Sequence, residues 1–344
     1  MSKIINVLLP CEFDNNKPGP GHKKDLVNII NFFLNSNYIV NIAYSDRKKV
    51  YRNNKVLKLS DYLNQIKRGK EKLLVGPLYL FRSVIWKFPS TTYIYVADSP
   101  MKTSICNFFI NPIYFYRILY NYFSELAIKN KNIIVASQEE FSWFSSCGHD
   151  IKKIHLLFPS PSFFDNKSII NPVNNKVLIY NPNGLGINIT REYLTKLNNL
   201  LESEEFNIDI IITGSQVDFF NEDLKKHLNL NVKCVKFIDD IDGLISSCKL
   251  SVLTDVGGSG LCNRSVQIIK NNCQLICTPD SVRGSNLYYD ENVFISNNIS
   301  DMANETILKL INKNNFRYSD SLIKHENKFN EQLNCLKNSI ERSL

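Results

Sequence analysis

Short apolar runs recur along the whole chain, and segments with helical spacing separate them. The run KIINVLLP (3–10) is followed by apolar residues at helical intervals over 26–34 and then by the run YIVNIAYS (38–45). Further runs of this kind stand at 72–78, 92–100, 132–140, 153–160, 176–184, 208–215, 232–238, 250–256, 274–281 and 292–297. Short buried strands that alternate with helices are typical of a parallel sheet covered on both faces. The sequence therefore predicts an α/β protein with doubly wound sheets.

One segment interrupts this alternation near the middle of the chain. PSPSFFDNKSIINPVNN (159–175) contains three prolines and no sustained period, as expected of a linker. The pattern restarts at residue 176, so we predict two domains of similar size, at 1–160 and 173–318. A long helical stretch is expected over 102–128, and the terminal segment 319–344 is also helical in its spacing.

Composition excludes several classes of protein. The 344 residues are 44% hydrophobic, which is too apolar for disorder, and no run approaches the roughly 18 uncharged apolar residues of a membrane span. The N-terminus lacks the pattern of an export signal, so a cytoplasmic location is expected. The nine cysteines form no C-x-x-C pair and are expected to be reduced. The net charge of +8 comes from dispersed residues, and no nucleic-acid-binding module is recognisable in the sequence. We therefore expect a phosphorylated ligand or an anionic lipid as the partner of these charges, rather than a nucleic acid.

The loops with the most ligand-like chemistry follow predicted strands directly. They are PGPGHK after the first strand, ADSP after Val96, NPNGLG after Tyr180, TGSQ after Ile212 and TDVGGSGLCNR after Leu253. Because ligands of open parallel sheets bind beyond the carboxyl ends of the strands, we expect both domains to contribute to one cleft.

The second half resembles the nucleotide-sugar-binding domain of GT-B glycosyltransferases, most closely the family 4 type. The resemblance is carried by KVLIYNPNG (176–184), IDIIITGSQ (208–216) and the segment from VKFIDDIDG to NVFISN (235–297), and NIIVASQEE (132–140) opens a stretch like the family's domain junction. It implies two Rossmann-like domains that face a central cleft, with the helix at 319–344 returning to the first. It also implies a nucleotide-sugar donor and a glycan or lipid-linked acceptor, as in bacterial surface polysaccharide synthesis.

This chain departs from the family at a pair of glutamates. The resemblance puts Ser259 where one Glu lies near the donor sugar, and Gln267 where the second Glu accepts hydrogen bonds from the ribose. Gln267 can still accept such a bond, whereas Ser259 supplies no charge. The amides of Gly257, Gly258 and Gly260 suit a diphosphate, since no Cβ blocks close approach and a helix begins after them. A purely steric turn of glycines is the alternative.

Other candidates follow from position and from the resemblance. Asp98, at the tip of a strand, is a candidate general base or a helix cap, and His22, beside Gly21, is a candidate donor to a phosphate or an acceptor oxygen. The remaining donor-binding candidates are Asn181, Asn183, Gly184, Gly214, Ser215, Arg264 and Arg283. Each of the two arginines is a candidate to neutralise the diphosphate, while Glu125 is expected to hold the hinge by packing or hydrogen bonding. No D-x-D stands at a strand end as a metal-holding motif, and the acidic FIDDIDG (237–243) lies where the family has a short loop before a helix, so neither a metal nor a cofactor is expected.

The stretch CNFFINPIYFYRILYNYF (106–123) is rich in aromatic residues. Such a stripe usually packs in the core, which we expect here. If its rings instead line an exposed face, they would bring the first domain into peripheral contact with the inner membrane surface.

The sequence as a whole favours a metal-independent glycosyltransferase. Two alternatives remain open: a sugar-nucleotide epimerase with the same two-domain plan, and a non-catalytic relative that serves as a partner subunit.

Overall fold

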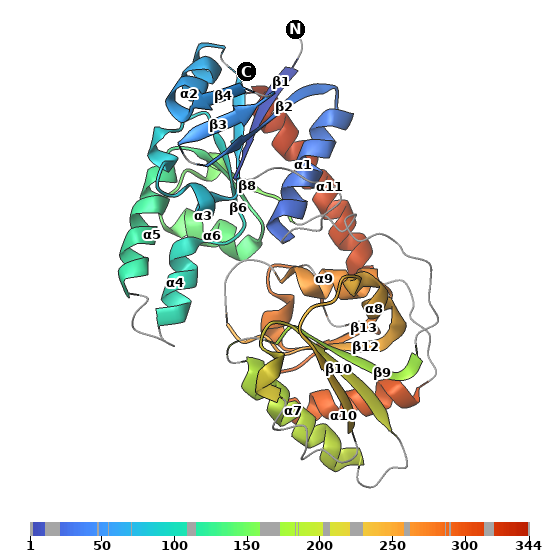
Figure 1. Ribbon diagram of the computed structural model, residues 1–344. Helices are drawn as coiled ribbons and strands as arrows, with labels where there is room; N and C mark the ends of the chain where they lie inside the picture. The colour runs from blue at the N-terminus through green and yellow to red at the C-terminus, as the bar shows by residue number, and fades with distance from the viewer. Residues whose placement is uncertain are drawn as a thin grey trace. The chain divides into compact units, whose positions relative to one another are not determined.

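The chain divides into two compact units (Figure 1). One comprises Met1–Ser160 and Asn327–Leu344, and the other comprises Pro161–Gly257 and Cys262–Glu326. The computed structural model describes residues 3–10, 21–46, 48–53, 55–69, 71–108, 115–158, 173–182, 184, 186–201, 207–220, 230–257, 262–285, 287–288, 290–312 and 320–342. Among them, no helix is both long enough and apolar enough to cross a lipid bilayer.

The first unit is built on an eight-stranded sheet in the order β4-β3-β2-β1-β5-β6-β7-β8. Six strands are parallel, and β3 and β4 add an antiparallel hairpin at one edge. The strands are β1 (Lys3–Leu9), β2 (Tyr38–Ser45), β3 (Lys49–Arg52), β4 (Lys55–Lys58), β5 (Lys72–Val75), β6 (Tyr93–Val96), β7 (Asn132–Val135) and β8 (Ile154–Leu156). The hairpin was not predicted, since its short basic strands bury Val50 but few other side chains.

Helices cover both faces of this sheet. On one face, α1 (Gly21–Asn35) and α11 (Asp320–Arg342) pack on the sheet through residues such as Ile29, Phe33 and Leu336. The other face is covered by α2 (Leu59–Arg68), α3 (Leu78–Phe81), η1 (Ile85–Lys87), α5 (Phe115–Ile128) and α6 (Gln138–Ser146). Figure 1 shows the two layers. This arrangement confirms the predicted doubly wound α/β class.

The expected helix at 102–128 is wrong as a single element. The structure has two helices in this range, α4 (Pro100–Phe108) and α5 (Phe115–Ile128), and they pack against each other (Figure 1). One continuous helix could not fold back on itself, so a uniform helical spacing concealed a helical hairpin.

The second unit has a six-stranded parallel sheet in the order β11-β10-β9-β12-β13-β14. Its strands are β9 (Val173–Tyr180), β10 (Ile208–Thr213), β11 (Leu230–Val235), β12 (Cys248–Leu253), β13 (Gln274–Cys277) and β14 (Val293–Ile295). In chain order this is 3-2-1-4-5-6, the order of dinucleotide-binding folds. The order reverses between β9 and β12, and ligands of such sheets bind where it does.

Two helical layers enclose the second sheet as well. One layer is α7 (Gly186–Leu201), η5 (Val217–Phe220) and α10 (Ile299–Ile311). The other is α8 (Ile241–Ser247), α9 (Asn263–Lys270) and η7 (Pro279–Val282). Between β10 and β11, the described helical part is the single turn η5, and 221–229 lies outside the described residues.

Candidate functional site

The loops after β9 and β10 contact each other closely at the carboxyl edge of the second sheet. Asn181 has a left-handed backbone with φ 52°, and its amide donates to the carbonyl oxygen of Thr213 at 2.8 Å. Gly214 has φ 130°, and a Cβ there would lie 2.9 Å from the Asn181 Cα. Only glycine adopts this conformation at such close range. The predicted candidates Asn181 and Gly214 therefore meet in the folded chain.

A second contact joins the start of α7 to the loop after β12. Thr190 and Thr254 are buried, their hydroxyls lie 2.7 Å apart, and both donate to the carbonyl oxygen of Gly186, at 2.8 and 3.1 Å. A Cβ at Gly186 would clash with the Thr254 carbonyl oxygen. Gly186 thus allows the amino end of α7 to sit against the loop after β12, a role that sequence reasoning missed.

Arg264, in the first turn of α9, spans the reversal point. Its Nη1 donates to the carbonyl oxygens of Tyr180 at 2.8 Å and Asn181 at 2.6 Å, and its Nη2 forms an ion pair with Asp255. One side chain therefore ties the loop after β9 to the loop after β12. The sequence predicted Arg264 as a diphosphate ligand, but its guanidinium is already engaged in this brace.

The Asp255 carboxylate contacts several side chains at this edge of the second sheet. It is buried, and besides Arg264 it accepts hydrogen bonds from the Ser281 hydroxyl at 3.0 Å and from the Cys262 thiol at 3.6 Å. A buried carboxylate needs such partners because it loses its hydration. The sequence analysis quoted the loop that holds Asp255 without singling it out. Its signal was an acid two residues beyond the end of a fully buried strand.

The loop after β13 reaches the predicted glycine turn. Gly257 has φ 67°, and its amide donates to Asp280 Oδ2 at 2.7 Å. Arg283 Nη1 donates to the Asp280 carbonyl oxygen at 2.7 Å. The predicted candidates Gly257 and Arg283 therefore lie on either side of Asp280. Gly258, Ser259 and Gly260 lie outside the described residues.

Gln267 is held by protein groups on both sides of its amide. Its Nε2 donates to Asp242 Oδ1 at 2.8 Å, and its Oε1 accepts from the Tyr180 hydroxyl at 3.2 Å. Burial raises the pKa of that hydroxyl to about 12, so Tyr180 is a neutral donor. Asn271 Nδ2 also donates to Asp242 Oδ1, at 2.8 Å. Asp242, from the acidic stretch 237–243, therefore holds the amide nitrogen of Gln267.

The remaining candidates of the second unit lie around the same edge. Gly184 has φ 52° and its amide donates to Gln216 Oε1 at 3.2 Å, while Ser215 is exposed beside Gly214. Asn183 lies outside the described residues. The structure thus brings together parts of four loops that the sequence had predicted separately.

In the first unit, the predicted Asp98 is exposed just beyond β6. Its neighbour Ser99 is buried and caps α4, because its hydroxyl accepts from the Lys102 amide at 3.0 Å. The same hydroxyl donates to Glu125 at 2.6 Å, and the Ser99 amide donates to Glu140 at 2.8 Å. Glu125 is therefore part of a buried polar cluster beneath Asp98. Gly21 and His22 begin α1, and the side chain of His22 lies outside the described residues.

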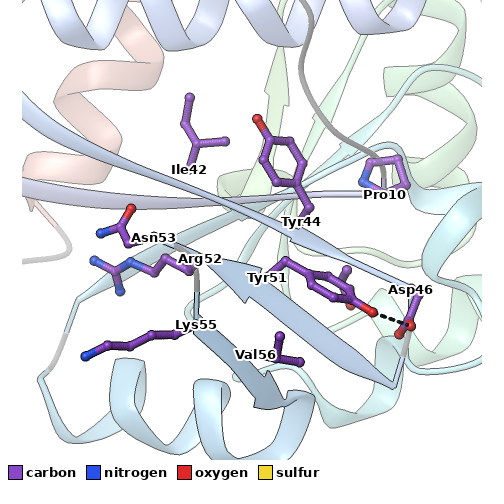
Figure 2. A pocket seen from close by; sticks show the side chains of 10 residues that line it. Pro10, Ile42, Tyr44, Asp46, Tyr51, Arg52, Asn53, Lys55 and Val56 are labelled. Carbon is purple, nitrogen blue, oxygen red and sulfur yellow. Dashed lines mark hydrogen bonds between the residues drawn. The ribbon is translucent and has the colours of Figure 1, made fainter.

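The first unit also contains an open hollow of about 680 Å³ beside the β2–β4 edge (Figure 2). Its lining includes the rings of Tyr44 and Tyr51, with Arg52 and Lys55 extending from the hairpin and Asp46 at the other end. Neither basic side chain forms an ion pair with a residue that the structure describes. Aromatic faces next to such cations suit a saccharide that carries negative charge.

Within the described ranges, no three His, Cys, Asp or Glu side chains are grouped so as to hold a metal ion.

The chain has two α/β units built on largely parallel sheets, and the candidate residues of the second unit lie where its strand order reverses. This is the GT-B class of fold. Anabaena HepE in complex with UDP and glucose has a TM-score of 0.60 to this chain and 12% identity, over 99% of this chain and 100% of that one. TarM has a TM-score of 0.59 and 13% identity over 85% of this chain. The pneumococcal O-GlcNAc transferase GtfA, with UDP and GlcNAc, has 0.52 and 11% over 86%.

These structural neighbours are GT-B glycosyltransferases, and at such identities they show the fold alone. The match spans 61% of the TarM chain and 62% of the GtfA chain. No protein-family model matches the sequence, and no curated protein is significantly similar to it.

Proposed function

We propose that this chain is a glycosyltransferase that takes a sugar from a nucleotide-activated donor, with the nucleotide bound by the second unit. The observation that carries the proposal is the assembly at the β9–β12 reversal. There, the loops after β9, β10, β12 and β13 converge on one edge, next to the amino ends of α7 and α9. Backbone amides and helix amino ends are suited to a diphosphate.

UDP is the nucleotide that we propose. HepE and GtfA were both solved with UDP and a sugar, and both share this chain's fold. In this proposal the phosphates displace Gln216 and Asp280 from the amides of Gly184 and Gly257, and Arg283 supplies positive charge. Arg264 acts as a positioning residue, because both of its terminal nitrogens are occupied by Tyr180, Asn181 and Asp255.

We further propose that the chain is a divergent relative of the family 4 type. Ser259 and Gln267 would then replace the glutamate pair, and the ribose would be bound by a group next to Gln267. The engagement of Gln267 with Asp242 supports a changed ribose contact rather than a simple replacement of Glu by Gln.

On the acceptor side, we propose a hydroxyl of a bacterial surface glycan or of its lipid-linked precursor. Asp98 would accept the proton of that hydroxyl, and its exposure at the tip of β6 supports this role. His22 stays a second candidate for a contact with the acceptor. The hollow lined by Tyr44, Tyr51 and Arg52 is suited to hold part of the glycan. No metal or cofactor takes part in this proposal.

A ligand panel and a product assay test the function in two stages. The full chain is heated with UDP, ADP, GDP and TDP, and we expect UDP alone to raise the melting temperature, since a ligand at 100 times its Kd stabilises by about 2.7 kcal/mol. Stabilisation by none of the four at millimolar concentration would favour the partner-subunit alternative.

Product analysis then uses UDP-sugars, with and without an oligosaccharide acceptor and in the presence of EDTA. Transfer that requires the acceptor supports the proposal, and a changed sugar nucleotide without acceptor would identify an epimerase. For Asp98→Asn we expect a loss of kcat of about 10²- to 10⁴-fold with an unchanged Kd for UDP. Full activity of that variant would remove Asp98 from the reaction.

A further inference from the structure

The helix α5 exposes its apolar residues and buries its polar ones. Seven large apolar side chains have exposed fractions of 47–78%: Phe115, Tyr116, Leu119, Tyr120, Tyr122, Phe123 and Leu126. The buried positions are Asn121, Ser124, Glu125 and Ile128. At 100° per residue, the seven exposed positions fall on one arc of about 160°. We call these seven residues the α5 aromatic face. The expectation that the 106–123 stretch packs in the core is wrong for residues 115–123, where six large apolar side chains are exposed.

Buried hydrogen bonds fix the orientation of this helix. Glu125 accepts from the Ser99 hydroxyl at 2.6 Å, the Met101 amide at 2.8 Å and the Trp143 indole at 3.2 Å. Burial raises the pKa of the Glu125 carboxyl, and these three hydrogen bonds act in the opposite direction. A rotation of α5 that buried the rings would break these hydrogen bonds and leave the Glu125 carboxyl without its donors.

Asn121 adds a second set of contacts on the same side of α5. It accepts from Arg82 Nη1 at 2.5 Å and donates to the Pro100 carbonyl oxygen at 2.9 Å and to the Ser104 hydroxyl at 2.7 Å. The polar side of α5 is therefore matched to α3, α4 and α6. These contacts hold the polar side of α5 against the rest of the unit, so the α5 aromatic face is directed outward.

The surroundings of the face are basic. The single turn η1 packs on α5 and carries Trp86, which is 67% exposed and lies 5.1 Å from Lys87 Nζ. Arg117 is an exposed residue of α5, and the exposed Lys129 follows the helix directly. The one carboxylate within α5 is the buried Glu125. A wide aromatic surface is thus bordered by cations and by no acid of its own helix.

We propose that the α5 aromatic face, with Trp86, binds an anionic lipid surface. Tyrosine and tryptophan rings have an apolar body and a polar tip, and they are enriched at the headgroup level of membranes. Lys87, Arg117 and Lys129 match the negative potential of anionic lipids. A two-fold contact between copies would set these cations against their counterparts, which disfavours a dimer through this face. The inference rests on α5 and η1 alone and is independent of the donor site.

Vesicle flotation of the full chain tests the proposal. The vesicles are phosphatidylcholine alone, or phosphatidylcholine with an equal part of phosphatidylglycerol, at low and at high salt. We expect flotation with the anionic vesicles, weaker flotation at high salt and little with the neutral ones. The double variant Tyr116→Ser/Phe123→Ser should reduce the partition coefficient by at least about tenfold, because two exposed rings no longer enter the interface.

Phe237→Ser is the matched control, since Phe237 is 79% exposed and belongs to the second unit. It should float like the parent, and both variants should keep the parent's melting temperature, because the substituted side chains are exposed. An absence of flotation with anionic vesicles would overturn the proposal, as would equal flotation of the double variant. Concentration-dependent dimerisation that the double variant abolishes, without vesicle binding, would instead assign the face to a second copy.

Discussion

Arg264 donates a hydrogen bond to the carbonyl oxygen of Asn181 at 2.6 Å, and so connects α9 to the loop that follows β9. With the ion pair to Asp255, this contact connects the two loops that flank the point where the strand order of the second sheet reverses. The position of the candidate nucleotide site depends on it, because the loops after β9 and β12 have no other charged link between them among the described residues.

Arg264→Ala should lower the free energy of unfolding by about 3–5 kcal/mol, because it leaves the buried Asp255 unpaired. Arg264→Lys should recover only part of this loss, since an ammonium cannot replace the fork that reaches three partners. Urea unfolding measures both. A double-mutant cycle with Asp255→Asn should give a coupling energy, and additive effects would show that the two side chains act separately.

Gly186→Ala should lower the free energy of unfolding by about 1–3 kcal/mol, since the new Cβ meets the backbone carbonyl of Thr254. We also expect weaker UDP binding, because the amino end of α7 must move. Gly69→Ala is the matched control. Its Cβ would meet only the flexible Glu71 side chain, at 3.2 Å, and the backbone there is right-handed. Equal stability of the two variants would contradict the close approach described for Gly186.

Gln267→Glu should destabilise the protein near neutral pH, since it puts a second carboxylate beside Asp242 Oδ1. Repulsion would raise the folded-state pKa of the pair above its unfolded value. The lost stability should therefore return as the pH falls to about 4, the ordinary range of these carboxyls.

The double variant Asp242→Asn/Gln267→Glu should recover most of the stability at pH 7 in thermal unfolding. If Gln267→Glu alone were neutral in stability and bound UDP more tightly, the site would be closer to the glutamate-containing family than we propose.

Stability should also fall as the pH decreases from about 6.5 to 4, in part because of His149. This side chain is buried against Phe144, and its Nδ1 has no hydrogen-bond partner among the described residues. Burial, with a smaller effect of Lys129, lowers the pKa of His149 to about 4. A lowered histidine pKa contributes stability that is present above the unfolded pKa and lost below it, by up to about 3 kcal/mol here.

His149→Leu removes the titrating group and should flatten the dependence of the unfolding free energy on pH between 6.5 and 4. His155, whose pKa burial also lowers to about 4, leaves a residual slope. An unchanged slope in the variant would mean that His149 has the same pKa in the folded and the unfolded protein.

Much of the fold could be predicted from the sequence because buried segments show local patterns of apolar residues. The run IDIIITGS shows β10 and the start of the loop after it, since a strand covered on both faces is apolar throughout. The hairpin β3–β4 left no such pattern, because its residues are mostly exposed. In the candidate site, Asn181 and Gly214 were found from their position after strands. Asp255 and Gly186 were missed because their roles depend on partners from other loops.

The order of apolar runs, helical spacings and polar loops by itself determined the α/β class and the two halves, and it predicted the edge of each sheet where ligands would bind. These properties follow from which residues avoid water, and that preference is local. Only the tertiary structure decided what Arg264 and α5 do. The partners of Arg264 at Tyr180 and Asn181 lie more than 80 positions away in the chain. The aromatic side of α5 is exposed because Ser99 and Trp143 hold Glu125 inside. A helix shows which residues share a face, but the neighbours that the fold supplies decide which face is buried.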